Sequence, residues 1–477
     1  MSPTPTTTPA PGRPGAPAAT RVEHDLLGPR EVPAAAYWGI HTLRALENFP
    51  VTGIPIGRYP VLVDALAAVK AAAAVTNVAC GALDARVADA VVEASREIRS
   101  GALRDQFVVD VIQGGAGTST NMNANEVVAN RALELLGHER GRYDVVHPIE
   151  HVNRSQSTND VYPTAIRLAL LRAVDDLLAE MTRLSASLQR QAGRCADVLK
   201  IGRTQLQEAV PMTLGQELAA FATAVQAERR PLLDVAQALR QVHLGGTAVG
   251  TGLTAPVGYR ESVVDALSRE SGELLRLTDD PMEATWGTGD LVRLSGVLRG
   301  LAVRLSKISN DLRLLSSGPR AGLAEIRLPA VQAGSSIMPG KVNPVIPEVV
   351  NQIAFAVIGR DVTVTLASEA AQLQLNAFEP VMVVSLLDSA EQLGTACRLL
   401  AERCIDGLEP NHERLTEGLE RSVGLVTALL PLIGYEAATA AASRALADGT
   451  SVLAALEEHG LGGLLPAALL GPVALEL

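Results

Sequence analysis

The sequence of 477 residues is short of aromatic residues, of cysteine and of positive charge. Aromatic residues make up 3% of the chain and hydrophobic residues 47%, so we expect an aliphatic core of packed helices rather than sheets. Against 52 Asp and Glu residues there are 41 Lys and Arg residues, a formal net charge of −11 with no long basic run, which argues against nucleic acid as a partner. An acidic protein that binds an acidic metabolite needs a local cluster of hydrogen-bond donors.

The few cysteines are widely spaced and form no CxxC pair: Cys80, Cys195, Cys397 and Cys404. Such cysteines behave as small hydrophobic residues, and they indicate a reducing, cytoplasmic location. No uninterrupted apolar run reaches the roughly eighteen residues that a membrane span requires. The most apolar early stretch, residues 61–80, contains Asp64 and Lys70. We therefore expect a soluble protein without a membrane partner.

Changes in composition along the chain predict four segments. Residues 1–20 carry six prolines and no acidic residue, which predicts a disordered tail. Residues 21–150 read as an N-terminal domain with short extended segments near 37–54, helices over 61–97 and a Gly/Asn-rich loop at 114–125. Residues 151–410 form a central domain, and residues 411–477 a small C-terminal helical domain.

The central segment is long and periodic, which predicts a bundle of five long helices. Its apolar residues recur at steps of three and four, the pattern of a buried helix face in a bundle. The two clearest seams are Ile166, Leu170, Val174, Leu177, Met181, Leu184 and Leu188, and Leu291, Leu294, Leu298, Leu301, Leu305, Ile308, Leu312 and Leu315. Three further faces run over 214–225, 349–360 and 381–405.

Four polar segments rich in short neutral donors interrupt the helices, at residues 114–123, 153–160, 202–207 and 334–343. Ser157, Thr158 and Asn159 stand immediately before a helix, so they are either N-caps or part of a carboxylate site. Both readings stay open, because the free N–H groups and the dipole of a helix start favour an anion.

Several other chemistries are excluded by spacing. Segment 334–343 lacks the spacing of a phosphate-binding loop, and the match of 250–255 to a dinucleotide fingerprint has no strand before it and Pro256 directly after it. The eight histidines show no metal-ligand spacing, and there is no Gly-x-Ser-x-Gly elbow. We expect no metal and no organic cofactor.

The four polar segments, in this order and separated by long helices, resemble the aspartase/fumarase superfamily, and GSSIMPGKVNP at 334–344 is similar to its signature sequence. The similarity runs from about residue 22 to about residue 450. The resemblance implies a mainly all-α fold with a central five-helix bundle flanked by two smaller domains. It also implies a homotetramer with a twenty-helix core and active sites that are each shared by three chains.

Within the superfamily, the segments 41–49 and 373–380 resemble aspartases more than fumarases, and Gln205 follows Thr204 where fumarases usually carry His. A substrate ammonium offers three donors and needs acceptors such as the side-chain oxygens of Asn159 and Gln205. The resemblance therefore implies elimination of ammonia from L-aspartate to give fumarate. Fumarate hydration, another succinyl carbon–nitrogen lyase and a catalytically silent homologue remain alternatives.

The resemblance also implies roles for individual residues. Ser335 is the general base, and Lys341 contributes to the field that makes its oxygen basic. The carboxylate that becomes the doubly charged aci form is held by Thr118, Ser157, Thr158 and Ser336. The other carboxylate is held by Thr204, Lys341 and Asn343. The amine is left to Asn159, Gln205 and Thr158.

Overall fold

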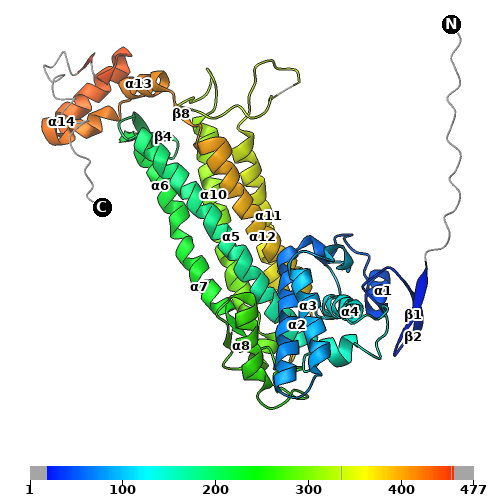
Figure 1. The fold of residues 1–477 in the computed structure, drawn as a ribbon. Helices are drawn as coiled ribbons and strands as arrows, with labels where there is room; N and C mark the ends of the chain where they lie inside the picture. Colours follow the sequence, from blue (N-terminus) through cyan, green and yellow to red (C-terminus); the bar gives the residue numbers. More distant parts are fainter. Residues whose placement is uncertain (1–18, 335, 453, 456–477) are drawn as a thin grey trace, which may run out of the picture. The chain divides into compact units, whose positions relative to one another are not determined.

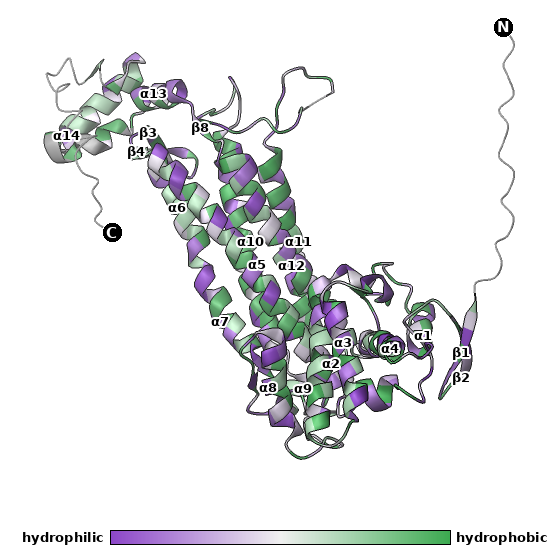
Figure 2. Ribbon diagram, in the orientation of Figure 1, coloured by the Kyte–Doolittle hydropathy of each residue, from purple (hydrophilic) through white to green (hydrophobic). Residues whose placement is uncertain are grey.

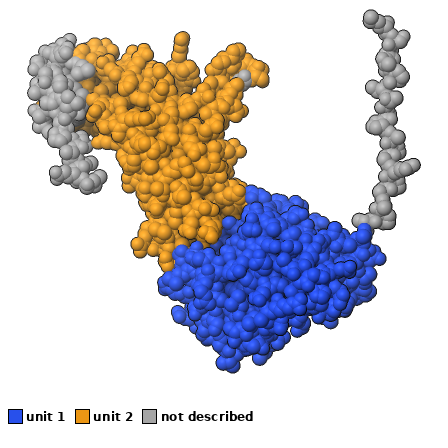
Figure 3. Space-filling view, viewed as in Figure 1, with its two compact units in different colours: residues 1–169, 240–287, 371–380 blue, residues 170–239, 288–370, 381–477 orange. Residues whose placement is uncertain are grey.

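A computed structural model describes residues 19–334, 336–452 and 454–455. Residues 1–18 of the expected disordered tail lie outside the described residues, and Thr20 already begins strand β1. The chain forms two compact units (Figure 3). Unit 1 comprises residues 1–169, 240–287 and 371–380, and unit 2 comprises residues 170–239, 288–370 and 381–477. The three-domain division with boundaries at residues 150 and 410 stays a prediction.

Unit 1 is built around helix α2, which packs against α3, α4 and α8 (Figure 1). Its helices are α1 (Ile40–Asn48), α2 (Pro60–Ala79), α3 (Ala85–Arg99), α4 (Thr118–Leu135), the first turns of α5 (Thr158–Arg194), α8 (Tyr259–Ser271) and α9 (Pro281–Trp286). Its strands are β1 (Thr20–Asp25) with β2 (Gly28–Pro33), antiparallel, and β5 (Gln241–Val242) with β6 (Arg276–Leu277), parallel.

Unit 2 contains the long helices, which run lengthwise beside one another (Figure 1). They are the remainder of α5, α6 (Leu214–Ala227) continued by α7 (Arg229–Leu239), α10 (Gly289–Leu315), α11 (Val345–Glu369) and α12 (Glu379–Leu400). The hairpin β3 (Leu199–Thr204) and β4 (Gln207–Thr213) packs against α13 (His412–Arg421) and α14 (Leu425–Asp448). Strand β7 (Ile326–Arg327) pairs with β8 (Glu409–Pro410).

The five-helix bundle is confirmed, and both predicted seams form its core. The predicted residues of α5 are at most 1% exposed and those of α10 at most 6%. Apolar residues run along the bundle helices, interspersed with polar ones (Figure 2). The three-and-four spacing therefore identified the buried faces correctly.

Two local predictions in unit 1 are wrong. No strand lies at 37–54, because residues 40–48 form α1, whose start is held by Glu126: its carboxylate accepts the backbone N–H groups of Gly39, His41 and Thr42. The expected loop at 114–125 ends early, since α4 begins at Thr118. The asparagines that suggested a loop are buried in α4, where tertiary hydrogen bonds override their weak helix propensity.

Two helices, α2 and α11, are long and apolar enough to cross a membrane by length and composition alone. In α2, 78% of the most apolar window is buried inside the protein, as in a core helix, and in α11 the share is 33%. All four cysteines are free.

Candidate active site

The start of α4 is shaped by a glycine. Gly117 has a left-handed backbone with φ of 83°, and a Cβ there would lie 2.3 Å from the ring of Tyr162, the fifth residue of α5. Only glycine fits between the two helices at this point. The close approach places Thr118, the exposed first residue of α4, near the first turns of α5.

A second link joins the same two helix starts. Asn121, one turn into α4, donates from Nδ2 to the Oγ1 of Thr158 at 3.0 Å. Thr158 is the first residue of α5. The structure thus brings together the first two predicted polar segments, with Thr118 and Thr158 on adjoining helix starts.

The first turn of α5 is anchored by Asp160, which is fully buried. Its carboxylate accepts the N–H groups of Ser157, Gly245 and Thr247, each at 2.9 Å. Burial raises the pKa of Asp160 to about 6, although these backbone hydrogen bonds act in the opposite direction. Ser157 also takes the capping role considered from the sequence, since its Oγ accepts the N–H of Asn159 at 3.2 Å.

The side chain of Asn159 is oriented by a neighbouring loop. Its Nδ2 donates to the carbonyl of Ala248 at 2.8 Å, and the backbone carbonyl of Asn159 accepts from the Nε2 of His243 at 2.8 Å. With the amide nitrogen engaged, the Oδ1 of Asn159 is presented as an acceptor. An acceptor at this point suits a ligand that carries an ammonium group.

Beneath these helix starts lies a buried cation, which in the sequence is only an interruption of an apolar run. Lys70 of α2 is 0% exposed, and its ammonium donates to three side-chain oxygens, those of Asn121, Asn153 and Gln156. A signal was present in the sequence: Lys70 and Asn77 are polar, seven residues apart on one face, within an otherwise apolar stretch. Both are fully buried.

In unit 2, Thr204 and Gln205 occupy the tip of the β3–β4 hairpin. Gln205 and Leu206 both have positive φ, 52° and 65°, as in the two-residue turns that match strand twist. Thr204 and Gln205 are exposed there. The hairpin is tied down by Lys200, whose ammonium pairs with Glu217 at 2.7 Å and Glu325 at 2.8 Å.

The signature loop closes on itself at its base. The N–H of Gly334 donates to the carbonyl of Lys341 at 2.8 Å, and the Nδ2 of Asn343 donates to the carbonyl of Gly334 at 3.2 Å. Ser336 and Lys341 are exposed. Ser335 lies outside the described residues.

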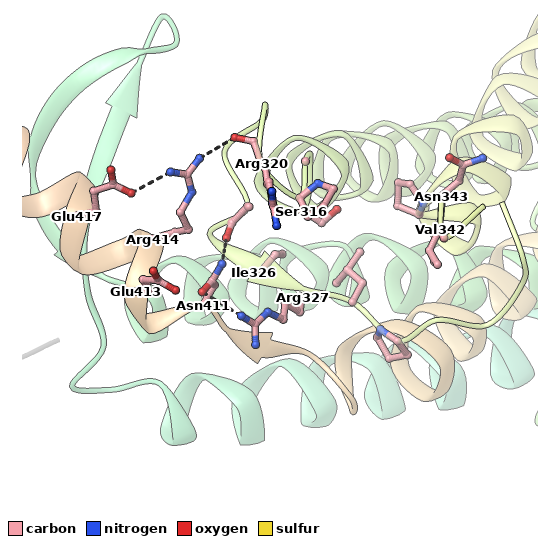
Figure 4. Close-up of a pocket in the computed structure, with 17 residues that line it drawn as sticks. Ser316, Arg320, Ile326, Arg327, Val342, Asn343, Asn411, Glu413, Arg414 and Glu417 are labelled. Carbon is pink, nitrogen blue, oxygen red and sulfur yellow. Dashed lines mark hydrogen bonds and ion pairs between the residues drawn. The ribbon is translucent and has the colours of Figure 1, made fainter. Parts of the chain in front are cut away.

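One side of this loop borders a cavity of about 660 Å³ (Figure 4). Gly340, Val342 and Asn343 line it together with Arg320 and Arg327. The hairpin tip is held by the ion pair of Arg203 with Glu325, and the loop is held by hydrogen bonds within itself. The predicted site residues therefore form three groups: the helix starts of unit 1, and the hairpin tip and the loop of unit 2.

Over the described ranges, no group of three or more His, Cys, Asp and Glu residues is placed to hold a metal ion. Hydroxyls, amides and ammonium groups dominate the three groups. Such a set can bind carboxylates and an amine and can stabilise developing negative charge.

Comparison with known proteins shows similarity to lyases along most of the chain. The family described as lyase matches residues 28–359, and the family described as fumarase C C-terminus matches residues 425–468. The aspartate ammonia-lyase of Pseudomonas aeruginosa is 54% identical over 445 residues, covering 93% of this chain and 94% of the relative. That of Helicobacter pylori is 49% identical over 432 residues, covering 91% and 92%.

Solved structures of similar fold point to the same group of proteins. A fumarate lyase:delta crystallin from Brucella melitensis has a TM-score of 0.92 at 54% identity, covering 94% of this chain and 98% of the other. A class II fumarase from Schistosoma mansoni has a TM-score of 0.89 at 33% identity, covering 95% and 100%. Fold and relatives together define a mainly helical enzyme of the lyase class. The chain belongs to the lyase family that matches residues 28–359, and within the aspartase/fumarase superfamily it is similar to aspartate ammonia-lyases along most of its length.

Proposed function

We propose that the protein is an aspartate ammonia-lyase, which converts L-aspartate to fumarate and ammonia. The observation that carries this proposal is the 54% identity to a relative of that name over 93% of the chain. The geometry of Asn159 supports it, because its Oδ1 has no donor among the described residues and can accept from a substrate ammonium. Gln205 offers a second neutral acceptor at an exposed hairpin tip, where a protonated His would repel the ammonium.

In the proposed mechanism, Ser335 removes the proton from the carbon beside one carboxylate, and the electron pair moves into that carboxylate to form the aci dianion. The double bond then forms as the carbon–nitrogen bond breaks, and nitrogen leaves with the bonding pair. The proton on Ser335 returns to solvent and the departing ammonia takes up a proton from solvent, so aspartate is converted to fumarate and ammonium. Stabilising the dianion is the main catalytic task.

The binding roles follow the three groups of the site. Thr118, Ser157 and Thr158 offer hydroxyls at the starts of α4 and α5, where the helix dipoles favour negative charge, and with Ser336 they hold the carboxylate that becomes the dianion. Thr204, Lys341 and Asn343 hold the other carboxylate. No metal and no organic cofactor takes part in this scheme.

We further propose a cytoplasmic homotetramer with a twenty-helix core, in which each site draws residues from three chains. An exposed apolar stripe on α11 supports assembly: Phe355, Val362 and Leu366 are 62%, 57% and 62% exposed. Apolar surface of this kind along a long helix is typical of a face that is buried against other chains.

The test is a direct assay of the purified protein. With L-aspartate we expect fumarate, seen by its ultraviolet absorbance, and an equal amount of ammonia. Turnover of L-malate without turnover of L-aspartate would establish a fumarase instead. Activity on neither compound would leave a different succinyl amine or a catalytically silent role.

A further inference from the structure

The ammonium of Lys70 uses all three of its donors on neutral groups. It donates to the Oδ1 of Asn121 at 2.7 Å, the Oδ1 of Asn153 at 3.0 Å and the Oε1 of Gln156 at 3.0 Å. Lys70 is 0% exposed, so these hydrogen bonds replace its hydration entirely. Asparagine and glutamine are neutral, so they do not neutralise the charge of Lys70. They suit a cation whose purpose is to orient amides.

The orientation of Asn121 follows from the chemistry of the protonated lysine, whose ammonium donates three hydrogen bonds and accepts none. The amide oxygen of Asn121 must face Lys70, so its Nδ2 faces the other way. There it donates to the Oγ1 of Thr158 at 3.0 Å and to the Oδ1 of Asn153 at 3.2 Å. A flipped amide would set two donors against each other at 2.7 Å.

The hydroxyl oxygen of Thr158 therefore accepts the hydrogen bond from Asn121. Its own proton has no acceptor among the described residues and is available to a ligand. The start of α5, where Thr158 lies, adds a dipole that favours an anion. An oxygen that offers a proton here suits a carboxylate better than an ammonium, which brings donors of its own.

We propose that Lys70 is a positioning residue, which fixes the amide of Asn121 so that Thr158 presents its O–H to a substrate carboxylate. This inference rests on the proposed function, in which Thr158 holds the carboxylate that becomes the dianion. It is distinct from the role of Lys341, which lies in the signature loop.

The electrostatic setting agrees with this role. Burial lowers the pKa of Lys70 to about 7, opposed by the charge of Asp160 on α5. The groups that face the ammonium from α4 and from the loop before α5 are the neutral amides of Asn121, Asn153 and Gln156. When protonated, Lys70 adds positive potential beneath the carboxylate without a carboxylate partner in its hydrogen-bond shell.

The test is a double-mutant cycle between Lys70→Met and Thr158→Val, read out in two ways. The first is kcat/KM with L-aspartate, and the second is the Kd of succinate, which has two carboxylates and no amine. We expect each single variant to lower kcat/KM by about 100-fold, mainly through kcat, since the hydroxyl acts on the developing dianion. In the Thr158→Val background, Lys70→Met should lower it by less than about threefold further.

Two other variants keep the test decisive. Asn77→Ala is the matched control, because Asn77 lies on the same helix and holds the same loop through the carbonyl of Arg154 and the hydroxyl of Ser155 without touching Asn121. The fold-losses of kcat/KM caused by Asn77→Ala and by Thr158→Val should multiply in the double variant. Asn121→Asp keeps the size and the partner of Lys70, yet presents an oxygen to Thr158 and turns that hydroxyl inward. It should match Thr158→Val in both readouts, and it decides the question if Lys70→Met fails to fold.

The proposal would be overturned if the fold-losses of kcat/KM for Lys70→Met and Thr158→Val multiply fully in the double variant. It would also be overturned if Asn121→Asp behaves as the wild type. Succinate binding separates this result from the fate of the proposed function. If L-aspartate is not turned over while the succinate cycle still shows coupling, the positioning role stands and the proposed reaction fails.

Discussion

The ammonium of Lys200 lies 2.8 Å from a carboxylate oxygen of Glu325, and both side chains are buried, at 2% and 7% exposed. This pair ties strand β3 to the segment that follows α10. Arg203, on the same strand, pairs with the other oxygen of Glu325. The next two residues along the chain are Thr204 and Gln205, so the tip of the hairpin depends on this ion-pair cluster for its position.

Glu325→Ala should therefore destabilise unit 2. It leaves Lys200 with Glu217 alone and removes the partner of Arg203, and we expect the free energy of unfolding to fall by about 3 kcal/mol. Asp311→Ala is the control, since it breaks the exposed pair with Lys307 on α10 and should cost less than about 1 kcal/mol. Denaturant titration checks both, and equal midpoints for the two variants would contradict the assignment.

His243 should make stability depend on pH. Burial lowers its pKa from 6.5 to about 4, and its Nε2 donates to the carbonyl of Asn159. Between these values the unfolded chain takes up a proton that the folded chain does not, so stability is lost as the pH falls below 6.5.

His243→Gln keeps a donor for Asn159 and does not titrate. On going from pH 7 to pH 5, the wild type should lose about 2 kcal/mol more unfolding free energy than this variant. Other titrating groups cancel in the comparison. Parallel stability curves for the two proteins would show that His243 does not titrate as described.

Gly117→Ala should displace the start of α4. The new Cβ would meet the ring of Tyr162, which is 1% exposed and has no room to retreat. We expect a loss of about 2–4 kcal/mol in unfolding free energy, together with lower activity through Thr118. Gly137→Ala has a similar φ, 81°, with nothing near its Cβ, so it measures the backbone cost alone, about 1–2 kcal/mol. Equal losses in the two variants would rule out the clash.

The sequence predicted the bundle because a buried helix face leaves a local record. Leu291 to Leu315 repeat within one element, and each step can be read from its neighbours. The network of Lys70 leaves no such record: Asn121 and Asn153 are 51 and 83 residues away along the chain. Only the fold brings them together.

Contacts that are distant along the chain also explain why the helix α4 was wrongly predicted as a loop. The asparagines of α4 favour loops by propensity, and they stay helical because distant groups bind them: Asn121 contacts Lys70, and Asn123 donates to the carbonyl of Gln106. The polar segments were found from the sequence because hydroxyls and amides cluster within a few residues. Whether these segments meet in one site depends on the fold and on the proposed assembly, which local patterns do not encode.

We propose that L-aspartate is bound by residues of separate chains, with Thr158 from one chain and Ser335 from another at the same site. Thr158→Val and Ser335→Ala should each lower the formation of fumarate at least about 100-fold.

When the two inactive variants are unfolded together and refolded as a mixture, sites with both residues intact should form. Activity should rise to about one quarter of the wild-type value, because each of the two positions is drawn at random from two kinds of chain. A mixture no more active than either variant alone would show that the two residues belong to the same chain at each site, or to no common site.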